Sequence, residues 1–362
     1  MSNLRDKLIK NSTVKDTAIL SESKFFIKKD MIQTMIPAVN IALSGKIDGG
    51  LTPGLTMVAG ESKHFKTAFL LVMLKAYLDK YPDAIALFYD SEFGTPQSYF
   101  ETFEIDLERV VHTPITNIEQ LKFDIMQQFE KLDRKDHVFV GIDSIGNLAS
   151  KKEIEDALEG KSVADMTRAK QLKSLFRMVT PHLTIKDIPM VVVNHTYKTM
   201  EMYAKDVIGG GKGSYYSADT IFIIGRQQEK LPGKEVTGYT FVINIEKSRY
   251  VKEKSKIPVS VSFGSGISRW SGLLDLASES GNVLKTRGKG YYYQRVDLTT
   301  GVIEEEQFKE KQTNTAAFWD PILKDEHFKS FVEKKYTLVY NNIMDEEDSV
   351  EEVYEDLEES EA

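Results

Sequence analysis

Short apolar, β-rich runs alternate with amphipathic helical patterns through the middle of this 362-residue sequence. This alternation is typical of βαβ units, and continuous apolar runs such as VFVGID and MVVVNH suit parallel strands that helices cover on both faces. The pattern predicts an α/β fold with a mainly parallel, doubly wound sheet. The expected strands are residues 55–59, 84–89, 137–142, 190–194 and 221–225, followed by 241–245 and 259–263, for which an antiparallel arrangement is an option. The expected helices are residues 67–80, 118–132 and 165–180.

The segment GESKHFKT joins the first expected strand to the first expected helix. A phosphate-binding loop needs inward-facing backbone N–H groups, a Lys that reaches the terminal phosphates and a Ser or Thr hydroxyl that meets Mg²⁺. Gly60, Lys66 and Thr67 fit that pattern, whereas Phe65 stands where the pattern has its second Gly. Alone, the motif fits an ordinary strand-turn-helix as well as a phosphate loop. As a phosphate loop, its nucleotide-binding residues are Gly60, Glu61, Ser62, Lys63, His64, Phe65, Lys66 and Thr67.

Two carboxylates follow expected strands, at the sheet edge where parallel sheets bind ligands. Asp143 ends the run VFVGID, and beside a phosphate loop this position holds Mg²⁺ through water or through Thr67. Glu92 lies two residues beyond LFYD, from where a carboxylate can polarise a water that attacks the terminal phosphate. Taken singly, Asp143 also fits a cap or turn former and Glu92 a solvent-exposed loop residue, and Asp90 competes for the role of Glu92.

A histidine and a glycine-rich segment follow the fourth expected strand. His195 closes VVVNH, as a hydrogen-bonding group at the same sheet edge or as an ordinary strand-end residue. The segment IGGGKG has no expected strand before it, and we expect a mobile loop there. Nearby, Lys198, Lys205 and Lys212 suit closure on a polyanion, although a plain flexible connection has the same composition.

Basic residues recur on other segments. The helix expected over 165–180 carries Arg168 and three further basic residues outside its apolar stripe. Later in the chain, Lys247 and Arg249 begin another basic run, NIEKSRYVKEKSK. Most basic helix faces are only solvated. These groups could nonetheless contact DNA, or a nucleotide on a neighbouring subunit as an arginine finger does.

Charge is distributed unevenly along the chain. The net charge is −8, but residues 345–362 contain eleven Asp or Glu and no Lys or Arg, so the rest of the chain has a net charge of +3. Such a block is usually a disordered, solvated tail, and it can also compete with nucleic acid for a basic surface. The sequence has no Cys, and its six His show no metal-ligand spacing, so any metal should arrive with a nucleotide.

These patterns divide the chain into four expected parts. Residues 1–30 form a polar, helix-compatible arm that is too short to fold alone, and residues 31–266 form the α/β core. Residues 267–344 suggest a small α/β domain, and residues 345–362 form the acidic tail. Because no leader and no run of about 18 apolar residues is present, we expect a cytoplasmic protein with no membrane partner.

From residue 31 to about residue 300 the chain resembles the RecA-type recombinases, and among these the UvsX recombinases of T-even-type phages, over nearly its full length. The matching segments are GESKHFKT, LFYDSEFG, VGIDSIGNLASKKEIEDAL, VVVNHTYKT, GKGSYYSAD and NIEKSRYVKEKSK. Phe65 in place of Gly is similar to what that phage group carries. The resemblance implies a RecA-like P-loop ATPase core with a polymerisation arm before it and a small C-terminal α/β domain after it.

The resemblance also implies roles at the ATP site. Lys66 and Thr67 would bind phosphate and Mg²⁺, Asp143 would support the metal, and Glu92 would activate water. Tyr99 matches the position whose ring stacks on adenine. The implied cofactors are ATP and Mg²⁺.

Further implied roles concern DNA and the neighbouring subunit. His195 falls where the family has a Gln that senses the terminal phosphate, and that difference leaves the strength of the coupling open. Lys247 and Arg249 match a basic pair that reaches the neighbour's ATP. The two DNA-binding loops would lie near residues 154–167 and 196–214. The DNA-binding candidates in or next to them are Arg168, Lys198, Lys205, Gly210, Gly211 and Lys212.

On this resemblance we expect an ATP-dependent homologous recombinase that forms helical filaments on single-stranded DNA and exchanges strands with homologous duplex DNA. Its processes would be phage DNA recombination, repair and recombination-dependent replication, in the cytoplasm of the host cell. A single-strand-binding protein and a recombination mediator are the implied partners. Two alternatives remain: a hexameric DNA helicase of the same fold, and a nucleotide-gated DNA-coating scaffold without useful turnover.

Overall fold

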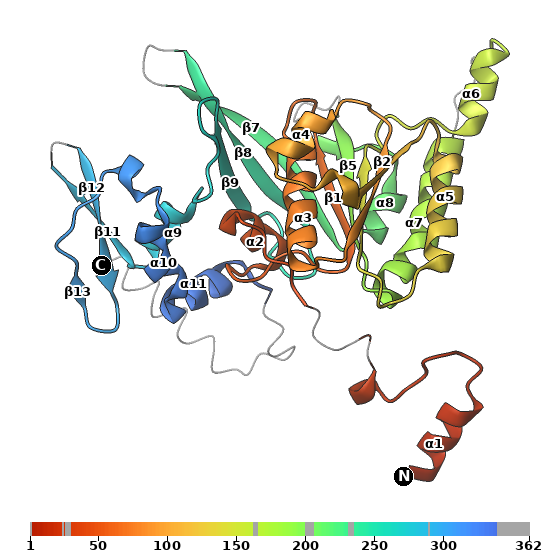
Figure 1. Ribbon diagram of the computed structural model, residues 1–362, viewed down its shortest axis with the longest axis horizontal. Coiled ribbons are helices and arrows are strands. Elements are labelled where there is room, and N and C mark those ends of the chain that lie inside the picture. Colours follow the sequence, from red (N-terminus) through yellow and green to blue (C-terminus); the bar gives the residue numbers. More distant parts are fainter. Residues whose placement is uncertain are drawn as a thin grey trace.

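In the computed structural model (Figure 1), the residues described are 2–23, 25, 30–161, 166–199, 206–230, 235–288 and 290–338. They contain a ten-stranded sheet in the order β10-β9-β8-β7-β1-β5-β4-β2-β3, with β6 paired to β5. The parallel strands are β7 (Thr220–Lys230), β1 (Gly54–Gly60), β5 (Pro189–Lys198), β4 (Val138–Asp143), β2 (Ile85–Asp90) and β3 (Val110–Pro114). The antiparallel strands are β8 (Val236–Lys247), β9 (Lys256–Ser262), β10 (Gly266–Ile267) and β6 (Asp206–Ile208). The prediction of a mainly parallel α/β sheet is confirmed.

All strands expected from the sequence are present, and the two later ones, now β8 and β9, are antiparallel. The pattern missed β3, whose side chains are exposed or only half-buried and therefore form no apolar run. It also missed the short strands β6 and β10.

Helices cover both faces of the sheet. The helices of this part are α2 (Pro37–Ser44), α3 (Lys66–Lys80), α4 (Gln97–Thr102), α5 (Ile118–Lys131), α6 (Lys151–Leu158), α7 (Thr167–Ile185) and α8 (Lys212–Ser217). Successive strand residues point to opposite faces, so Val58 packs in one core with α2 and α3, and Met57 packs in another with α5 and α7. Phe88 and Tyr89 divide in the same way. The sheet is therefore doubly wound.

The C-terminal part adjoins the antiparallel end of the sheet (Figure 1). It contains α9 (Leu273–Glu279), β11 (Val283–Arg287), β12 (Tyr291–Asp297), β13 (Val302–Ile303), α10 (Ala316–Lys324) and α11 (Glu326–Tyr336). Trp270 and Trp319 pack in the same apolar core as α2 and α3. The division expected between residues 266 and 267 stays a prediction.

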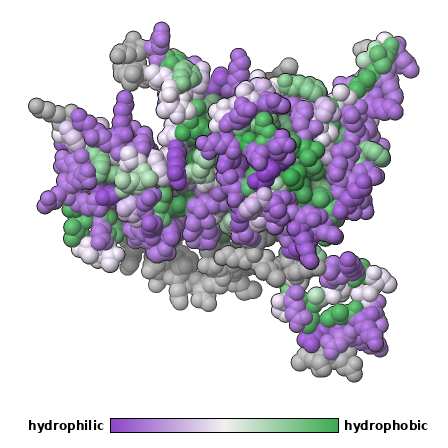
Figure 2. Space-filling model, viewed as in Figure 1, coloured by the Kyte–Doolittle hydropathy of each residue, from purple (hydrophilic) through white to green (hydrophobic). Residues whose placement is uncertain are grey.

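Two helices extend from the main body in Figure 1. These are α1 (Ser2–Asn11) and α6. The space-filling view shows apolar patches among polar ones on α1 (Figure 2), and Leu4 and Leu8 of this helix are exposed. Among the described residues, no helix combines the length and the apolar character that crossing a membrane requires.

The parallel register brings the predicted polar residues to one edge of the sheet. Gly60 at the end of β1 pairs with His195 in β5, and Asp90 at the end of β2 pairs with Asp143 at the end of β4. These four positions come from distant parts of the sequence. Their shared edge is where a ligand of an open parallel sheet binds.

Candidate functional site

The phosphate-loop candidate, residues 60–67, runs from the end of β1 into α3. Lys63 and Phe65 both have a φ of 61°, in the left-handed region. Such a backbone costs a non-glycine residue about 1–2 kcal/mol. The strain explains why the general motif has Gly at the position of Phe65.

Aromatic packing holds the ring of Phe65. Its centroid lies 4.8 Å from that of Phe241 in β8, with an interplanar angle of 11°. It also meets the ring of Phe69 in α3 edge-on, at 5.8 Å. Each such pair contributes about 0.5–1.5 kcal/mol beyond area burial, so two pairs are comparable in size to the backbone strain. Phe65 can therefore replace Gly while the loop keeps its left-handed turn.

The first two residues of α3 carry the polar groups that a phosphate loop requires. Lys66 is 7% exposed, and its Nζ donates a hydrogen bond to the backbone oxygen of Glu61 at 2.7 Å. Burial lowers the pKa of Lys66, and the carboxylates of Glu92 and Asp143 oppose that shift. Thr67 Oγ1 donates to Asp143 Oδ2 at 2.6 Å. Ammonium, hydroxyl and helix N-terminus together favour an anion here.

Asp143 has the features of a metal-binding carboxylate. It is 2% exposed, and burial raises its pKa from 3.8 to about 6. Among the described residues, its Oδ1 is a buried atom without a hydrogen-bond partner. A buried, unsatisfied carboxylate oxygen beside the Thr67 hydroxyl fits Mg²⁺, which takes its other ligands from water and phosphate. The residues present therefore fit a cation delivered with a nucleotide.

Glu92 reaches the same region from the turn after β2. Its Oε1 accepts hydrogen bonds from Ser144 Oγ at 2.5 Å and Asn147 Nδ2 at 3.1 Å, and it lies 2.8 Å from His195 Nε2. The contact with His195 contributes most to lowering the pKa of Glu92, followed on that side by Ser144, while burial opposes the shift. Glu92 is therefore ionised near neutral pH and can accept a proton.

Asp90, the alternative to Glu92, shapes the turn instead. Its Oδ1 accepts the backbone N–H groups of Glu92 at 3.0 Å and Phe93 at 2.8 Å. His112 Nε2 lies 3.2 Å from its Oδ2. The Asp90 carboxylate is thus engaged in holding Glu92 in place, and the geometry favours Glu92 as the acid that faces a ligand.

His195 connects this acid to the glycine-rich segment. Its ring contacts Glu92, and its backbone oxygen accepts the N–H of Gly209 at 2.9 Å. A Cβ on Gly146 would lie 2.3 Å from His195 Cδ2, so only glycine leaves room for the ring. Sequence reasoning did not assign roles to Ser144, Gly146 or Asn147. The available signal was their position directly after Asp143, in IDSIGN.

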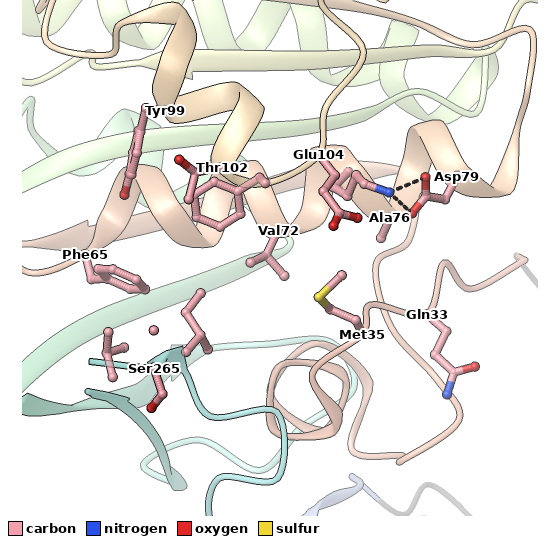
Figure 3. Close-up of a pocket in the computed structure, with 15 residues that line it drawn as sticks. Gln33, Met35, Phe65, Val72, Ala76, Asp79, Tyr99, Thr102, Glu104 and Ser265 are labelled. Atoms are coloured by element: carbon pink, nitrogen blue, oxygen red, sulfur yellow. Dashed lines mark hydrogen bonds and ion pairs between the residues drawn. The ribbon is translucent and has the colours of Figure 1, made fainter. Parts of the chain in front are cut away.

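Two adjoining hollows lie beside the loop. A cleft of about 270 Å³ is lined by the loop, Glu92, Asp143 and His195, and a more apolar cavity of about 520 Å³ lies along α3. Phe65 and Tyr99 line both of them. In Figure 3 the rings of Tyr99 and Phe65 stand at one end of the larger cavity, and Asp79 stands at the other. Together, the two hollows offer a polar end for phosphates and an aromatic, apolar end for a planar base.

Comparison with known proteins places the whole chain in a family. A family model described as the C-terminal domain of the bacteriophage T4 recombination and repair protein matches residues 270–332. The recombination and repair protein of Enterobacteria phage T4 is 51% identical over 340 residues, which are 93% of this chain and 87% of that protein. The chain belongs to the UvsX family of RecA-type recombinases.

Bacterial RecA proteins are more distant relatives of this UvsX-family chain. The RecA protein of Pseudarthrobacter chlorophenolicus is 24% identical over 303 residues, which are 80% of this chain and 82% of that protein. The RecA protein of a Synechococcus strain is 26% identical over 278 residues, 76% of this chain and 71% of that protein. The RecA-like core expected from the motifs is confirmed.

Several residues that the UvsX resemblance assigns to DNA lie near the ends of β5 and β6. Lys198 Nζ is 2.9 Å from Asp206 Oδ1 and 3.6 Å from Glu61 Oε1. Gly210 and Gly211 have φ of 90° and 77°, and Lys212 begins α8. The expectation that no strand precedes the glycines was wrong, because β6 comes directly before them; its three residues were too few to form a pattern. Lys205 lies outside the described residues, and the DNA roles stay predictions.

Arg168, the remaining DNA candidate, braces the turn after β4. Its guanidinium donates to the backbone oxygens of Leu148 at 2.8 Å, Ile145 at 3.0 Å and Gly146 at 2.7 Å. Arg168 therefore supports the turn that carries the partners of Glu92, and its contact with DNA stays a prediction.

Lys247 and Arg249 lie at the edge of the sheet opposite the loop. Lys247 ends β8, and Arg249 Nε lies 2.5 Å from Asp219 Oδ1. Asp219 is hydrogen-bonded to Leu55 at the start of β1, whereas Gly60 stands at the end of β1. At about 3.3 Å per residue, the strand separates Leu55 from Gly60 by roughly 17 Å. The basic pair therefore cannot reach the loop of its own chain.

The packing of Phe65 predicts an ordered series of stabilities. Phe65→Ala keeps the strained backbone and loses both ring contacts, whereas Phe65→Gly loses the same contacts and relieves the strain. We expect both variants to be less stable than the parent, with the alanine variant lower than the glycine variant by about 1 kcal/mol in the free energy of unfolding. Denaturant titration measures this. An alanine variant as stable as the glycine variant would contradict a left-handed Phe65.

The burial of Asp143 predicts a gain in stability when its charge is removed. Its folded-state pKa lies above 3.8, so ionisation costs stability as the pH rises past 3.8 and the full cost is present at pH 8. In nucleotide-free protein at pH 8, Asp143→Asn should raise the free energy of unfolding, by up to about 3 kcal/mol. If Mg²⁺-ATP binds at this loop, the same variant should lose the stabilisation that it confers in a thermal melt. Asp320→Asn, which removes the charge of an exposed carboxylate, is the matched control and should show neither effect.

Proposed function

We propose that this protein is an ATP-dependent recombinase that forms helical filaments on single-stranded DNA and pairs that strand with homologous duplex DNA. The observation that carries the proposal is that the loop with Asp143 and Glu92 occupies one edge of the sheet, whereas Lys247 and Arg249, which the UvsX resemblance assigns to the same kind of site, occupy the other. A site divided in this way is complete only when a second subunit supplies the basic pair. Such a contact joins two different surfaces and can repeat into an open helix.

In the proposed reaction, Lys66 Nζ exchanges the Glu61 carbonyl for phosphate oxygens, and the base of ATP lies against Tyr99. Mg²⁺ held by Thr67 and Asp143 would neutralise phosphate charge when bound. Glu92 accepts a proton from the water that attacks the terminal phosphate, because it is ionised near neutral pH.

ATP is proposed to act by favouring one of two filament states. It bridges two subunits, so it binds the assembled form more tightly than the separate chains, and hydrolysis removes that preference. His195 is the proposed connection to DNA, because it contacts both Glu92 and the backbone of Gly209. Loss of the terminal phosphate would thus change the glycine-rich segment.

DNA contacts are proposed for residues 154–167 and 196–214. Backbone phosphates would supply affinity through basic groups such as Lys198, and base pairing between the strands would supply sequence specificity. A single-strand-binding protein and a recombination mediator are proposed partners, with the cytoplasm of the phage's host as the place of action. The arm of residues 1–30 is proposed to dock on the adjacent subunit.

Electron microscopy on circular single-stranded DNA with a slowly hydrolysed ATP analogue tests the architecture. We expect continuous helical filaments that require nucleotide. Lys66→Ala should abolish them, since it removes the charge that meets the phosphates. Closed rings would favour the helicase, and DNA without bound protein would contradict the proposed nucleic-acid function. Normal filaments from the Lys66→Ala protein would overturn the assignment of residues 60–67 as a phosphate-binding loop.

Glu92→Gln separates a recombinase from a scaffold. We expect ATP binding and filaments to persist, while DNA-stimulated ATP turnover falls by about 100-fold or more, the size of a general-base contribution. Strand exchange should fail with it. The control is Glu101→Gln, an exposed carboxylate on α4, which should leave turnover unchanged. If strand exchange survives the loss of turnover, the scaffold is the better description.

A further inference from the structure

Asp219 is a fixed carboxylate beside the exposed basic pair. It lies between α8 and β7, and its side chain is 17% exposed. Its backbone N–H donates to the oxygen of Leu55 at 2.9 Å, and its Oδ2 accepts the N–H of Leu55 at 2.9 Å. A Cβ on Gly54 would lie 2.2 Å from the same Oδ2, so the carboxylate fills the space that a side chain would need. These contacts fasten Asp219 to the start of β1.

The other carboxylate oxygen of Asp219 holds Arg249. Arg249 has a side chain that is 68% exposed, in the turn after β8. The ion pair, at 2.5 Å, uses Nε of the guanidinium. Among the described residues, the two terminal guanidinium nitrogens of Arg249 make no ion pair. The contact therefore orients the guanidinium and leaves its outer donors available for a phosphate group.

Lys247 takes its position from contacts other than Asp219, whose charge acts on it only electrostatically, opposing the effect of burial on its pKa. Its Nζ donates to the backbone oxygens of Tyr215 at 2.9 Å and Tyr216 at 3.2 Å, near the end of α8, and it lies 5.5 Å from the centroid of the Tyr215 ring. A change at Asp219 therefore affects the position of Arg249 first. This difference makes the two members of the basic pair separable by experiment.

We propose that Asp219 is a positioning residue that directs Arg249 into the ATP site of the neighbouring subunit. The inference rests on the proposed function, since it needs a site shared between subunits. A long, exposed side chain samples many rotamers, and each wrong one points the guanidinium away from the phosphates. Asp219 reduces the number of rotamers that Arg249 samples, because the Asp219 carboxylate is itself anchored to the central sheet. Arg249 is therefore oriented before the neighbouring subunit binds.

Asp219→Asn is the informative variant. An amide oxygen can still accept the N–H of Leu55, so the fold at β1 is retained, but the charge that holds Arg249 is lost. In DNA-stimulated ATP turnover we expect kcat to fall by about ten- to a hundredfold, with less than a threefold change in KM, because a misplaced group costs rate more than binding. Glu304→Gln, which breaks the ion pair with Arg295 in the C-terminal part, is the matched control. A normal or raised kcat in Asp219→Asn would overturn the proposal.

A double variant tests whether Asp219 acts through Arg249. If it does, Asp219→Asn should cause no further loss in a protein that already carries Arg249→Ala. A residue that only braces the fold would add its own loss to that of Arg249→Ala. Additive losses would therefore overturn the positioning role, whatever the effect of the single variant.

Mixed filaments distinguish this inference from the proposed function. Glu92→Gln subunits have an intact Arg249 but cannot turn ATP over, and Asp219→Asn subunits have the opposite defect. In an equal mixture, about one interface in four combines an intact acid with a well-placed Arg249, because the contact is heterologous. We expect turnover to recover to about that fraction, as it should for Arg249→Ala mixed with Glu92→Gln. Recovery with Arg249→Ala but not with Asp219→Asn would overturn this inference alone, and failure of both mixtures would overturn the shared site.

Discussion

The candidate site depends first on the parallel register of β1, β5, β4 and β2. This register sets Gly60 beside His195 and Asp90 beside Asp143, although these residues are far apart in sequence. A slip of one residue would turn each side chain to the other face of the sheet. The alternating packing of Met57 and Val58 into separate cores prevents such a slip. The apolar layers thus determine where the polar groups meet.

Several features at the loop edge are unfavourable for folding, and a bound ligand would offset the cost of the buried charges among them. Phe65 has a strained backbone, Lys66 is a buried ammonium with a lowered pKa, and Asp143 is a buried carboxyl with a raised pKa and an unsatisfied oxygen. Phosphate would meet the ammonium, and Mg²⁺ would meet the carboxylate. Local strain and buried charge of this kind persist because the surrounding packing compensates for them. The stacked ring of Phe241 is the clearest such compensation.

The sequence predicted the elements better than the contacts between them. Buried strands form apolar runs and were found, whereas β3, with its exposed side chains, was not. The candidates Lys66, Thr67, Asp143, Glu92 and His195 could be located because each ends or follows a recognisable strand, and the structure brings them together. Without the resemblance, the choice between Asp90 and Glu92 could not be made, since both lie at the end of the same strand and only the backbone contacts of Asp90 separate them. The partner of Arg249 was also beyond sequence reasoning, because Asp219 lies between α8 and β7, far from Arg249 in the sequence.

The two halves of the proposed shared site lie at opposite ends of β1. A buried strand with helices on both faces is closely packed and resists stretching, so the sheet fixes the vector from the loop to the basic pair. In the proposed open assembly, that vector would set the step from one ATP to the next. ATP at an interface would then alter the assembly mainly through groups at the two edges, whose contacts are polar and exchangeable. On this proposal, His195 at one edge and Asp219 at the other are the positions where binding and turnover can be adjusted while the core stays unchanged.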